Sequence, residues 1–476
     1  MTNAIKKKGY DDCQLNRDEI KLLILPMEEK VQEENCDEMK ILVESMVEKL
    51  EEVSSLLSNY DIYRVPMQLQ RVNPDTYTPL SVSIGPLHYN KEHLRTMETH
   101  KLRYLKRFLN PPFQKTLDDY VEAMSNLEER ARKCYSETMG MVKNEFVKMM
   151  VMDGCFILGF LDNIESGAND HFISNVSWYE EIKIDLIKLE NQLPFFVLEH
   201  LDGLIFPRLP GQYTFSHHIY ANLLSSFAKG FHGPTLGSEE QIKSLQLPKG
   251  ETKHFLHLLH CVLVPPVPSS PVTRRRWKCG EKILPLKYCA SELRSAGVKF
   301  QKEEMSSDHS PPKKTSLFDI TFDMEKGILT IPTIMIDDST EIILRNLISF
   351  EQGQKYCTKY FTAYAYFMSG LIDTPSDVKL LEQKGIITNH LCNTEDIVTL
   401  FGNIGKYVTL DARYPYFYGV IKDLEDYHNK SWNKSKASLM QKYFNTPWAS
   451  ISVGAAALLL IFTIIQTTCS ILQVKP

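Results

Sequence analysis

The chain ends in a long stretch without charged residues, and this feature constrains the fold more than any other. No Asp, Glu, Lys or Arg occurs from Tyr443 to Val474. A bilayer has a hydrocarbon core of about 30 Å, which about 20 apolar residues cross as a helix. The residues from Ile451 to Leu472 meet that length, and Trp448 stands where an aromatic side chain would meet the interface. The sequence therefore predicts a transmembrane helix over 447–472.

A buried C-terminal helix of a globular core is the alternative to this span. Gln466, Thr467, Thr468 and Ser470 make the apolar run imperfect. Apolar runs of about 10–14 residues are typical of such core helices, and this run is longer. The length criterion therefore favours the membrane interpretation.

The lysines that flank the stretch indicate an orientation. Lys434, Lys436 and Lys442 precede it, and Lys475 alone follows it. Because positive residues favour the cytosolic side, we expect the N-terminal part to face the cytosol, from the plasma membrane or an endomembrane. The first residues lack the apolar region of a secretory signal, and the ten cysteines include no CxxC pair, which agrees with reduced thiols.

Composition and motifs narrow the classes of function. A net charge of -5 gives no overall basic field, so we expect no nucleic-acid partner. The basic segment Arg274–Lys278 is typical of a solvated loop, with contact to anionic lipid as the second interpretation. No Walker A loop, GxSxG, HExxH or GxGxxG motif occurs. We therefore assign no catalytic, cofactor-binding or metal-binding residue, and expect no cofactor.

The patterns divide the chain into three regions. An N-terminal extension covers 1–60, a mainly helical domain covers 61–446 with loops near 262–282 and 301–315, and the predicted span covers 447–472. In the extension, apolar residues at alternating spacings predict an amphipathic helix that packs on its own domain rather than forming an obligate coiled coil. These residues are Met39, Val43, Met46, Leu50, Val53 and Leu57.

Prolines and periodicity predict the local structure of the central domain. Pro66, Pro74, Pro79 and Pro86 forbid a continuous helix, so the segment that contains them should be extended and rich in turns. One β-hairpin is predicted, from strands over 318–322 and 327–332. Helices are expected over 117–160, over 182–201 with a break at Pro194, and over 290–300, 342–350, 359–372, 376–384 and 394–405.

A histidine cluster and a cysteine are the first candidates for chemistry. His254, His257 and His260, followed by Cys261, form the most metal-like pattern. Since the first and last of these histidines point about 240° apart on a helix, one helix cannot offer all three to one ion, and we favour structural histidines. Cys155 has apolar neighbours, and burial would make its thiol inert rather than nucleophilic.

Five polar residues lie within otherwise apolar runs: Asp153, Asp185, Glu190, Asn191 and Gln192. Paired carboxylates can act as an acid and a base. Polar groups in such surroundings more often bond to the backbone and to each other. We therefore predict a buried polar network that joins helices. The alternative is a catalytic set, which would have to converge on a pocket that solvent reaches.

Several phrases occur together and in one order. They are Ile62-Tyr-Arg-Val-Pro66, Asn73-Pro74, Tyr77-x-Pro79, Val82-Ser-Ile-Gly-Pro-x-His88, Met97-Glu-x-His-Lys101, Asp153-Gly-Cys-Phe156, Asp185-x-x-x-Leu-Glu-Asn-Gln-Leu-Pro-Phe-Phe196, Asn346-Leu-Ile-x-Phe-Glu351 and Tyr443-Phe-x-x-Pro-Trp448. With these phrases the chain resembles, over about Ile62 to Thr468, the plant family called domain of unknown function 247.

The resemblance implies a mainly helical domain with a C-terminal transmembrane helix, in a plant. Members are described as membrane proteins without an established activity, some of them tied to self-incompatibility recognition in grasses, and the family has no agreed catalytic residues. We therefore expect a mainly α protein with one small β-hairpin, anchored to a lipid bilayer through 447–472. Its expected role is to bind an unidentified protein in recognition or signalling, with a homo-oligomer as an open alternative. The competing hypothesis is a membrane-anchored hydrolase or transferase that uses the buried Asp, Glu and Asn residues.

Overall fold

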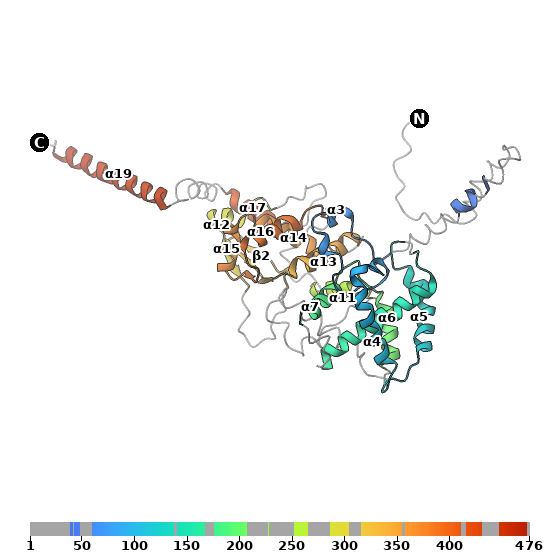
Figure 1. The fold of residues 1–476 in the computed structure, drawn as a ribbon. Coiled ribbons are helices and arrows are strands. Elements are labelled where there is room, and N and C mark those ends of the chain that lie inside the picture. Colours follow the sequence, from blue (N-terminus) through green and yellow to red (C-terminus); the bar gives the residue numbers. More distant parts are fainter. Residues whose placement is uncertain are drawn as a thin grey trace, which may run out of the picture. The chain divides into compact units, whose positions relative to one another are not determined.

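The computed structural model of the chain describes residues 39–40, 42–47, 60–137, 140–166, 176–206, 227, 252–264, 286–303, 316–354, 358–410, 416–430 and 447–473 (Figure 1). The chain divides into two compact units, Met1–Tyr60 and Asp61–Pro476. In the first unit, residues 39–40 and 42–47 are helical, and Met39 and Met46 are exposed. The remainder of the predicted amphipathic helix lies outside the described residues.

The second unit begins with the proline-rich segment over 61–86, and four short helical turns lie in it and directly after it. They are α3 (Met67–Gln70), η3 (Pro74–Thr76), η4 (Pro86–His88) and η5 (Glu92–Leu94). Two of the turns begin at a proline, whose fixed φ suits the first position of a helix. The prediction that this segment forms no continuous helix is confirmed.

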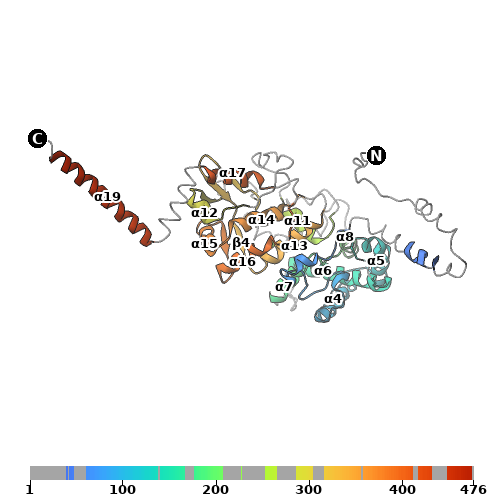
Figure 2. The same cartoon turned by 90° about the horizontal axis from the view of Figure 1, so that it is seen from above.

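In the N-terminal half of the second unit, the central helix is α6 (Lys143–Ser166). The helices that pack against it are α4 (Arg95–Phe108), α5 (Leu117–Arg132) and α8 (Phe195–Ile205) (Figures 1 and 2). The predicted helical region 117–160 is therefore two helices. Glycines allow the close approach of these helices, because a Cβ at Gly154 would clash with Leu201 of α8, and one at Gly159 with Tyr104 of α4.

The helix α7 (Val176–Asp185) ends earlier than the sequence predicts. The next helix, α8, does begin directly after Pro194, as the predicted break requires. Residues 186–194 are turns and irregular backbone, and their side chains bond to other segments instead of continuing the helix.

The C-terminal half of the unit is built around α13 (Thr340–Gly353), whose residues are almost all buried. The helices α13 and α16 (Thr394–Ile404) pack together, and they lie side by side in both ribbon views (Figures 1 and 2). The other helices of this half are α11 (Phe255–Leu263), α12 (Ala290–Ser295), α14 (Tyr360–Leu371), α15 (Pro375–Gln383) and α17 (Tyr418–Asn429).

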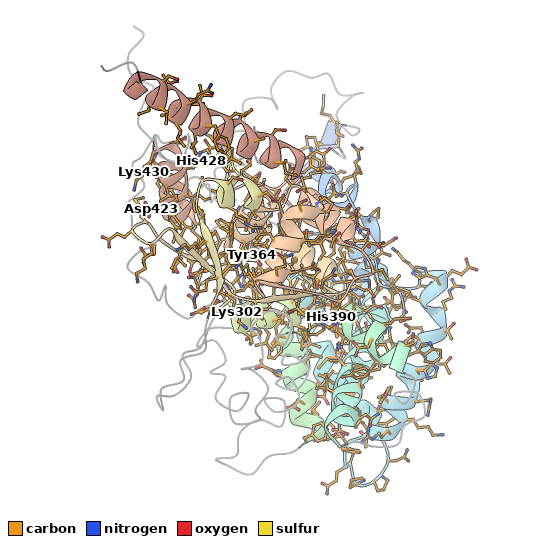
Figure 3. The ribbon with its side chains drawn as sticks, turned by 90° about the vertical axis from the view of Figure 1, so that its left-hand side faces the viewer. Lys302, Tyr364, His390, Asp423, His428 and Lys430 are labelled. Atoms are coloured by element: carbon orange, nitrogen blue, oxygen red, sulfur yellow. The ribbon has the colours of Figure 1, made fainter. Side chains whose placement is uncertain are left out.

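Two small sheets accompany these helices. The predicted hairpin is confirmed, since β2 (Thr321–Asp323) pairs antiparallel with β3 (Ile328–Ile331). Two parallel pairings were not predicted: β1 (Lys299–Lys302) with β3, and β4 (Ile334–Ile336) with β5 (Ile387–Asn389). Lys302 ends β1 and His390 follows β5, and both are labelled in Figure 3.

One predicted loop needs correction because of these strands. Gln301 and Lys302 lie in β1, not in a loop over 301–315. Parallel partners are joined by long connections, so a local pattern in the sequence does not reveal the pairing.

The last helix is α19 (Pro447–Gln473). Across the part of the chain that the structure describes, no helix is both long enough and apolar enough to cross a bilayer. The prediction of a transmembrane helix over 447–472, and with it of a tail-anchored, single-pass membrane protein, is therefore wrong. Gln466, Thr467 and Thr468 follow the apolar run directly, so the uninterrupted run is shorter than the about 20 residues that a span requires. The predicted cytosolic orientation stays a prediction.

Candidate functional site

Asp185 lies at the end of α7 and binds the backbone of the proline-rich segment. Its carboxylate accepts hydrogen bonds from the N–H groups of Leu80 (3.0 Å), Ser81 (2.7 Å) and Val82 (2.9 Å). The Nζ of Lys188 lies 3.1 Å from the carboxylate, and both side chains are fully buried. One carboxylate therefore satisfies three consecutive backbone donors that no strand or helix satisfies.

Asn191 continues the same contact toward Ile84. Its Oδ1 accepts a hydrogen bond from the N–H of Ile84 at 2.7 Å. Its Nδ2 donates to the carbonyl oxygens of Val82 and Asp185, each at 3.0 Å. Because the amide both donates and accepts, it holds the proline-rich segment and the turn after α7 in one fixed register.

Glu190 binds the start of the proline-rich segment. Its Oε1 accepts hydrogen bonds from the N–H of Val65 (2.8 Å) and from Nε2 of Gln70 (2.7 Å). The Nε2 of His88 lies 3.0 Å from Oε2 of this carboxylate. Burial favours a higher pKa of Glu190, but the hydrogen bonds from His88 and the Val65 N–H outweigh it and lower the pKa. Burial lowers the pKa of His88.

Asp153, on α6, forms a buried ion pair with a lysine that the sequence analysis did not single out. The Nζ of Lys101, which is 0% exposed, lies 2.6 Å from Asp153, from Glu98 and from the carbonyl oxygen of Ser83. The other oxygen of Asp153 accepts from the N–H of Gly85 at 2.8 Å. Burial raises the pKa of Asp153 to about 6.

Gln192 connects the same region to α11. Its Oε1 accepts a hydrogen bond from the N–H of Leu256 (3.1 Å), and its Nε2 donates to the carbonyl of Leu186 (2.7 Å). The carbonyl of Gln192 accepts from the hydroxyl of Tyr135 at 3.0 Å. Gly85 passes so close to this carbonyl that a Cβ would clash with it, and its φ of 73° also requires glycine.

These five residues form what we call the polar cluster: Asp153, Asp185, Glu190, Asn191 and Gln192. Each is at most 3% exposed, and each is hydrogen-bonded. The prediction of a buried polar network is confirmed, although it joins helices mainly to the proline-rich segment. The alternative hypothesis, a catalytic set, requires that these side chains converge on a pocket that solvent reaches. The burial of all five side chains contradicts that requirement.

The phrase from Asn346 to Glu351 supplies two further side chains that bind backbone and that the sequence analysis left without a role. Asn346 accepts a hydrogen bond from the N–H of Leu189 (2.9 Å) and donates to the carbonyl of Thr76 (2.8 Å). Glu351 accepts from the N–H groups of Phe361 (2.9 Å) and Thr362 (2.8 Å), at the start of α14. A polar residue inside a strongly apolar helix was the available signal for both.

The histidines of α11 have structural partners. The Nδ1 of His254 accepts from the N–H of His257 and caps the helix. His257 lies 3.3 Å from the Sγ of Cys261, and His260 lies 3.1 Å from Glu351. Burial lowers the pKa of His257 to about 4 and raises that of Cys261 to about 11, so this pair is uncharged near neutral pH.

The described part of the chain contains no group of three or more His, Cys, Asp or Glu side chains that could hold a metal ion. Cys155 is fully buried, and burial raises the pKa of its thiol to about 12. A thiol with that pKa stays protonated at neutral pH and is a poor nucleophile.

A surface cavity lies among the described residues. Its volume is about 340 Å³, and it is bounded by the middle of the proline-rich segment, the start of α13 and one side of α16. The sequence analysis did not predict it, because its wall comes from three segments far apart in the chain. The lining residues are Val72, Asn73, Asp337, Asp338, Glu341, Leu391, Asp396, Thr399, Leu400 and Asn403. We call it the acidic cavity.

Two of the four carboxylates in this wall are held in place by hydrogen bonds. Asp337 accepts from the N–H of Ser339 at 2.9 Å, and Glu341 accepts from Asn73 at 3.2 Å. Glu341 also accepts from Nε of Arg345 at 2.7 Å.

The other two carboxylates of the wall are exposed. Asp338 and Asp396 have no hydrogen bond or ion pair with any residue that the structure describes. Since no Lys, Arg or His lines the cavity, its wall carries a net negative charge.

Comparison with known proteins places the chain in a family. The model of the family DUF247, described as a plant protein of unknown function, matches residues 62–462. The chain belongs to this family. The match contains the proline-rich segment, the polar cluster and the acidic cavity. The predicted resemblance is confirmed as to the family and its plant origin, whereas its membrane aspect has no support.

Two relatives of this DUF247 protein come from Arabidopsis thaliana. The UPF0481 protein At3g47200 is 31% identical, over 87% of this chain and 86% of its own length. The putative UPF0481 protein At3g02645 is 24% identical, over 85% of this chain and 89% of its own length. No solved structure gives a significant match. The printed names assign no activity to either relative.

Proposed function

We propose that this DUF247 protein is a protein-binding component of plant recognition or signalling. One observation carries the proposal: the polar side chains that could have formed a catalytic set are sealed inside and bonded to backbone. The acidic cavity, in contrast, presents carboxylates to solvent in a concave site. A rigid frame with an exposed charged recess suits recognition of another macromolecule.

The fixed frame supports this role energetically. Binding costs less free energy when the binding surface is already ordered before the partner arrives. The polar cluster and Asn346 fix the segments that carry Val72 and Asn73, and the hydrogen bonds of Asp337 fix the start of α13. The wall of the cavity is therefore assembled in the unbound protein.

Direct binding between purified proteins tests the proposal. The full chain, affinity-tagged and expressed in plant tissue, would be cross-linked in place, and each captured protein would then be purified and titrated against it by calorimetry. We expect at least one protein that binds in a one-to-one titration with a Kd in the micromolar range or below, which is typical of specific transient complexes. If no captured protein binds when both are pure, the proposal fails.

A further inference from the structure

We propose that the acidic cavity binds a Lys or Arg side chain presented by a basic segment of the partner protein. This inference rests on the proposed function and gives the chemistry of its binding site. It starts from the cavity itself, whose volume of about 340 Å³ falls in the range of sites that hold a ligand group.

The lining of the cavity fits the two ends of a long basic side chain. Val72, Leu391 and Leu400 supply apolar wall, and Leu400 is buried. Lys and Arg place an aliphatic stem along apolar surface and keep the charged group at a polar site. The carboxylates stand on the same wall, so one side chain can contact both parts.

The charges of the wall select a cation. Asp338 lies just before α13 and Asp396 lies on α16, and both line the cavity, so a cationic group inside it would meet negative charge from both segments. Neither has a hydrogen bond or ion pair with another described residue, so binding breaks no existing pair of theirs. An anionic group would meet repulsion from the same residues, which makes a phosphate or an acidic peptide a poor fit.

A matched pair of charge-reversal variants tests this site. The test variant is Asp338→Lys/Asp396→Lys. The control is Glu325→Lys/Glu395→Lys, which changes net charge equally at two exposed carboxylates outside the cavity; Glu395 is the neighbour of Asp396 on α16. The probe is a phage-displayed library of random peptides, selected on the full-length wild-type chain. Enriched peptides would be synthesised and titrated against all three proteins, at low and at physiological salt.

We expect enriched peptides to contain Lys or Arg beside apolar residues. The test variant should weaken their binding at least about tenfold, the control should leave it within about twofold, and added salt should weaken binding to the wild type. Circular dichroism should show the same fold for all three proteins.

Three outcomes would overturn the inference. One is enrichment without basic residues, and another is equal loss of affinity in both variants. The third is a carbodiimide cross-link between the cavity carboxylates and the chain's own basic segment 274–278 that still forms when a basic peptide is present at saturating concentration. A purified partner protein that binds wild type and test variant equally would refute this site while leaving the proposed function standing.

Discussion

Replacing Asp185 by Asn tests whether the polar cluster holds the proline-rich segment. The substitution keeps the shape of the side chain but removes its charge and places an NH₂ group where one carboxylate oxygen stood. The amide oxygen at the Oδ2 position can still accept from the N–H groups of Leu80, Ser81 and Val82. The NH₂ group at the Oδ1 position then faces the Nζ of Lys188, which loses its negatively charged partner. Breaking a buried pair of this kind costs about 3–5 kcal/mol.

Hydrogen exchange of individual amides is the sharpest assay for this change. A local loss of about 3 kcal/mol corresponds to roughly 100-fold faster exchange of the amides at 80–82, since 1.4 kcal/mol is a factor of about ten. Urea unfolding would report the total cost. The control is Glu180→Gln, an exposed residue of the same helix that, among the described residues, forms an ion pair with Lys183 alone. We expect it to change stability by less than about 0.5 kcal/mol.

Two results would contradict this reasoning. If Asp185→Asn lowered the stability by less than about 1 kcal/mol, the charge of Asp185 and its buried pair with Lys188 would not be what holds the segment. If exchange rose equally over α13 and over 80–82, the effect would be global unfolding and not the release of one segment.

Three further predictions follow from the same contacts. Burial raises the pKa of Asp153 to about 6, whereas its ordinary pKa is near 4, so between these two pH values the folded chain binds more protons than the unfolded chain. The stability that this group contributes therefore falls as the pH rises from about 4 to about 6. The substitution Asp153→Asn should remove this slope from a plot of Tm against pH. Gly85→Ala should destabilise the protein by about 2 kcal/mol or more in urea unfolding, because its φ is 73° and its Cβ would clash with Gln192, whereas Gly203→Ala, with open space around it, should be neutral or stabilising. Glu351→Gln weakens the acceptors for Phe361 and Thr362 and should cost about 2 kcal/mol by thermal unfolding, and an unchanged Tm would contradict that role.

The sequence predicted the helices well where apolar periodicity was long, and poorly where distant contacts decide the structure. The helix α5 begins at Leu117 and α16 at Thr394, where the sequence predicts these starts. The end of α7 was predicted too late, because Asp185 uses its side chain to bind residues about a hundred positions away. Helical periodicity contains no information about such a partner.

The C-terminal helix shows a second limit of sequence patterns. Hydropathy over the residues from Ile451 to Ile465 is high, and this hydropathy together with the absence of charged residues predicts a helix that spans a bilayer. The same stretch forms a helix, as predicted, but within the described chain it does not meet the requirement for a span. Length and helicity were therefore predictable, whereas the solvent around the helix was not.

The acidic cavity was beyond the reach of the sequence for a related reason. Its carboxylates come from the start of α13 and from α16, and its apolar wall includes Val72 of the proline-rich segment. Each of these residues is ordinary in its own local pattern. The recess depends on contacts between distant residues, such as the hydrogen bonds from Asn346 to Thr76 and from Asn73 to Glu341 that join the segment to α13, and a local pattern does not reveal them.

The prolines leave backbone N–H groups without acceptors, and the polar cluster supplies those acceptors. Prolines prevent the segment over 61–86 from forming one continuous helix or a strand, so many of its buried N–H groups find no acceptor in regular structure. Leaving each unsatisfied would cost about 1–3 kcal/mol. Asp153, Asp185, Glu190 and Asn191 supply those acceptors, to the N–H groups of Val65, Leu80, Ser81, Val82, Ile84 and Gly85. A cluster that resembles catalytic machinery in the sequence is thereby required by the backbone of another segment.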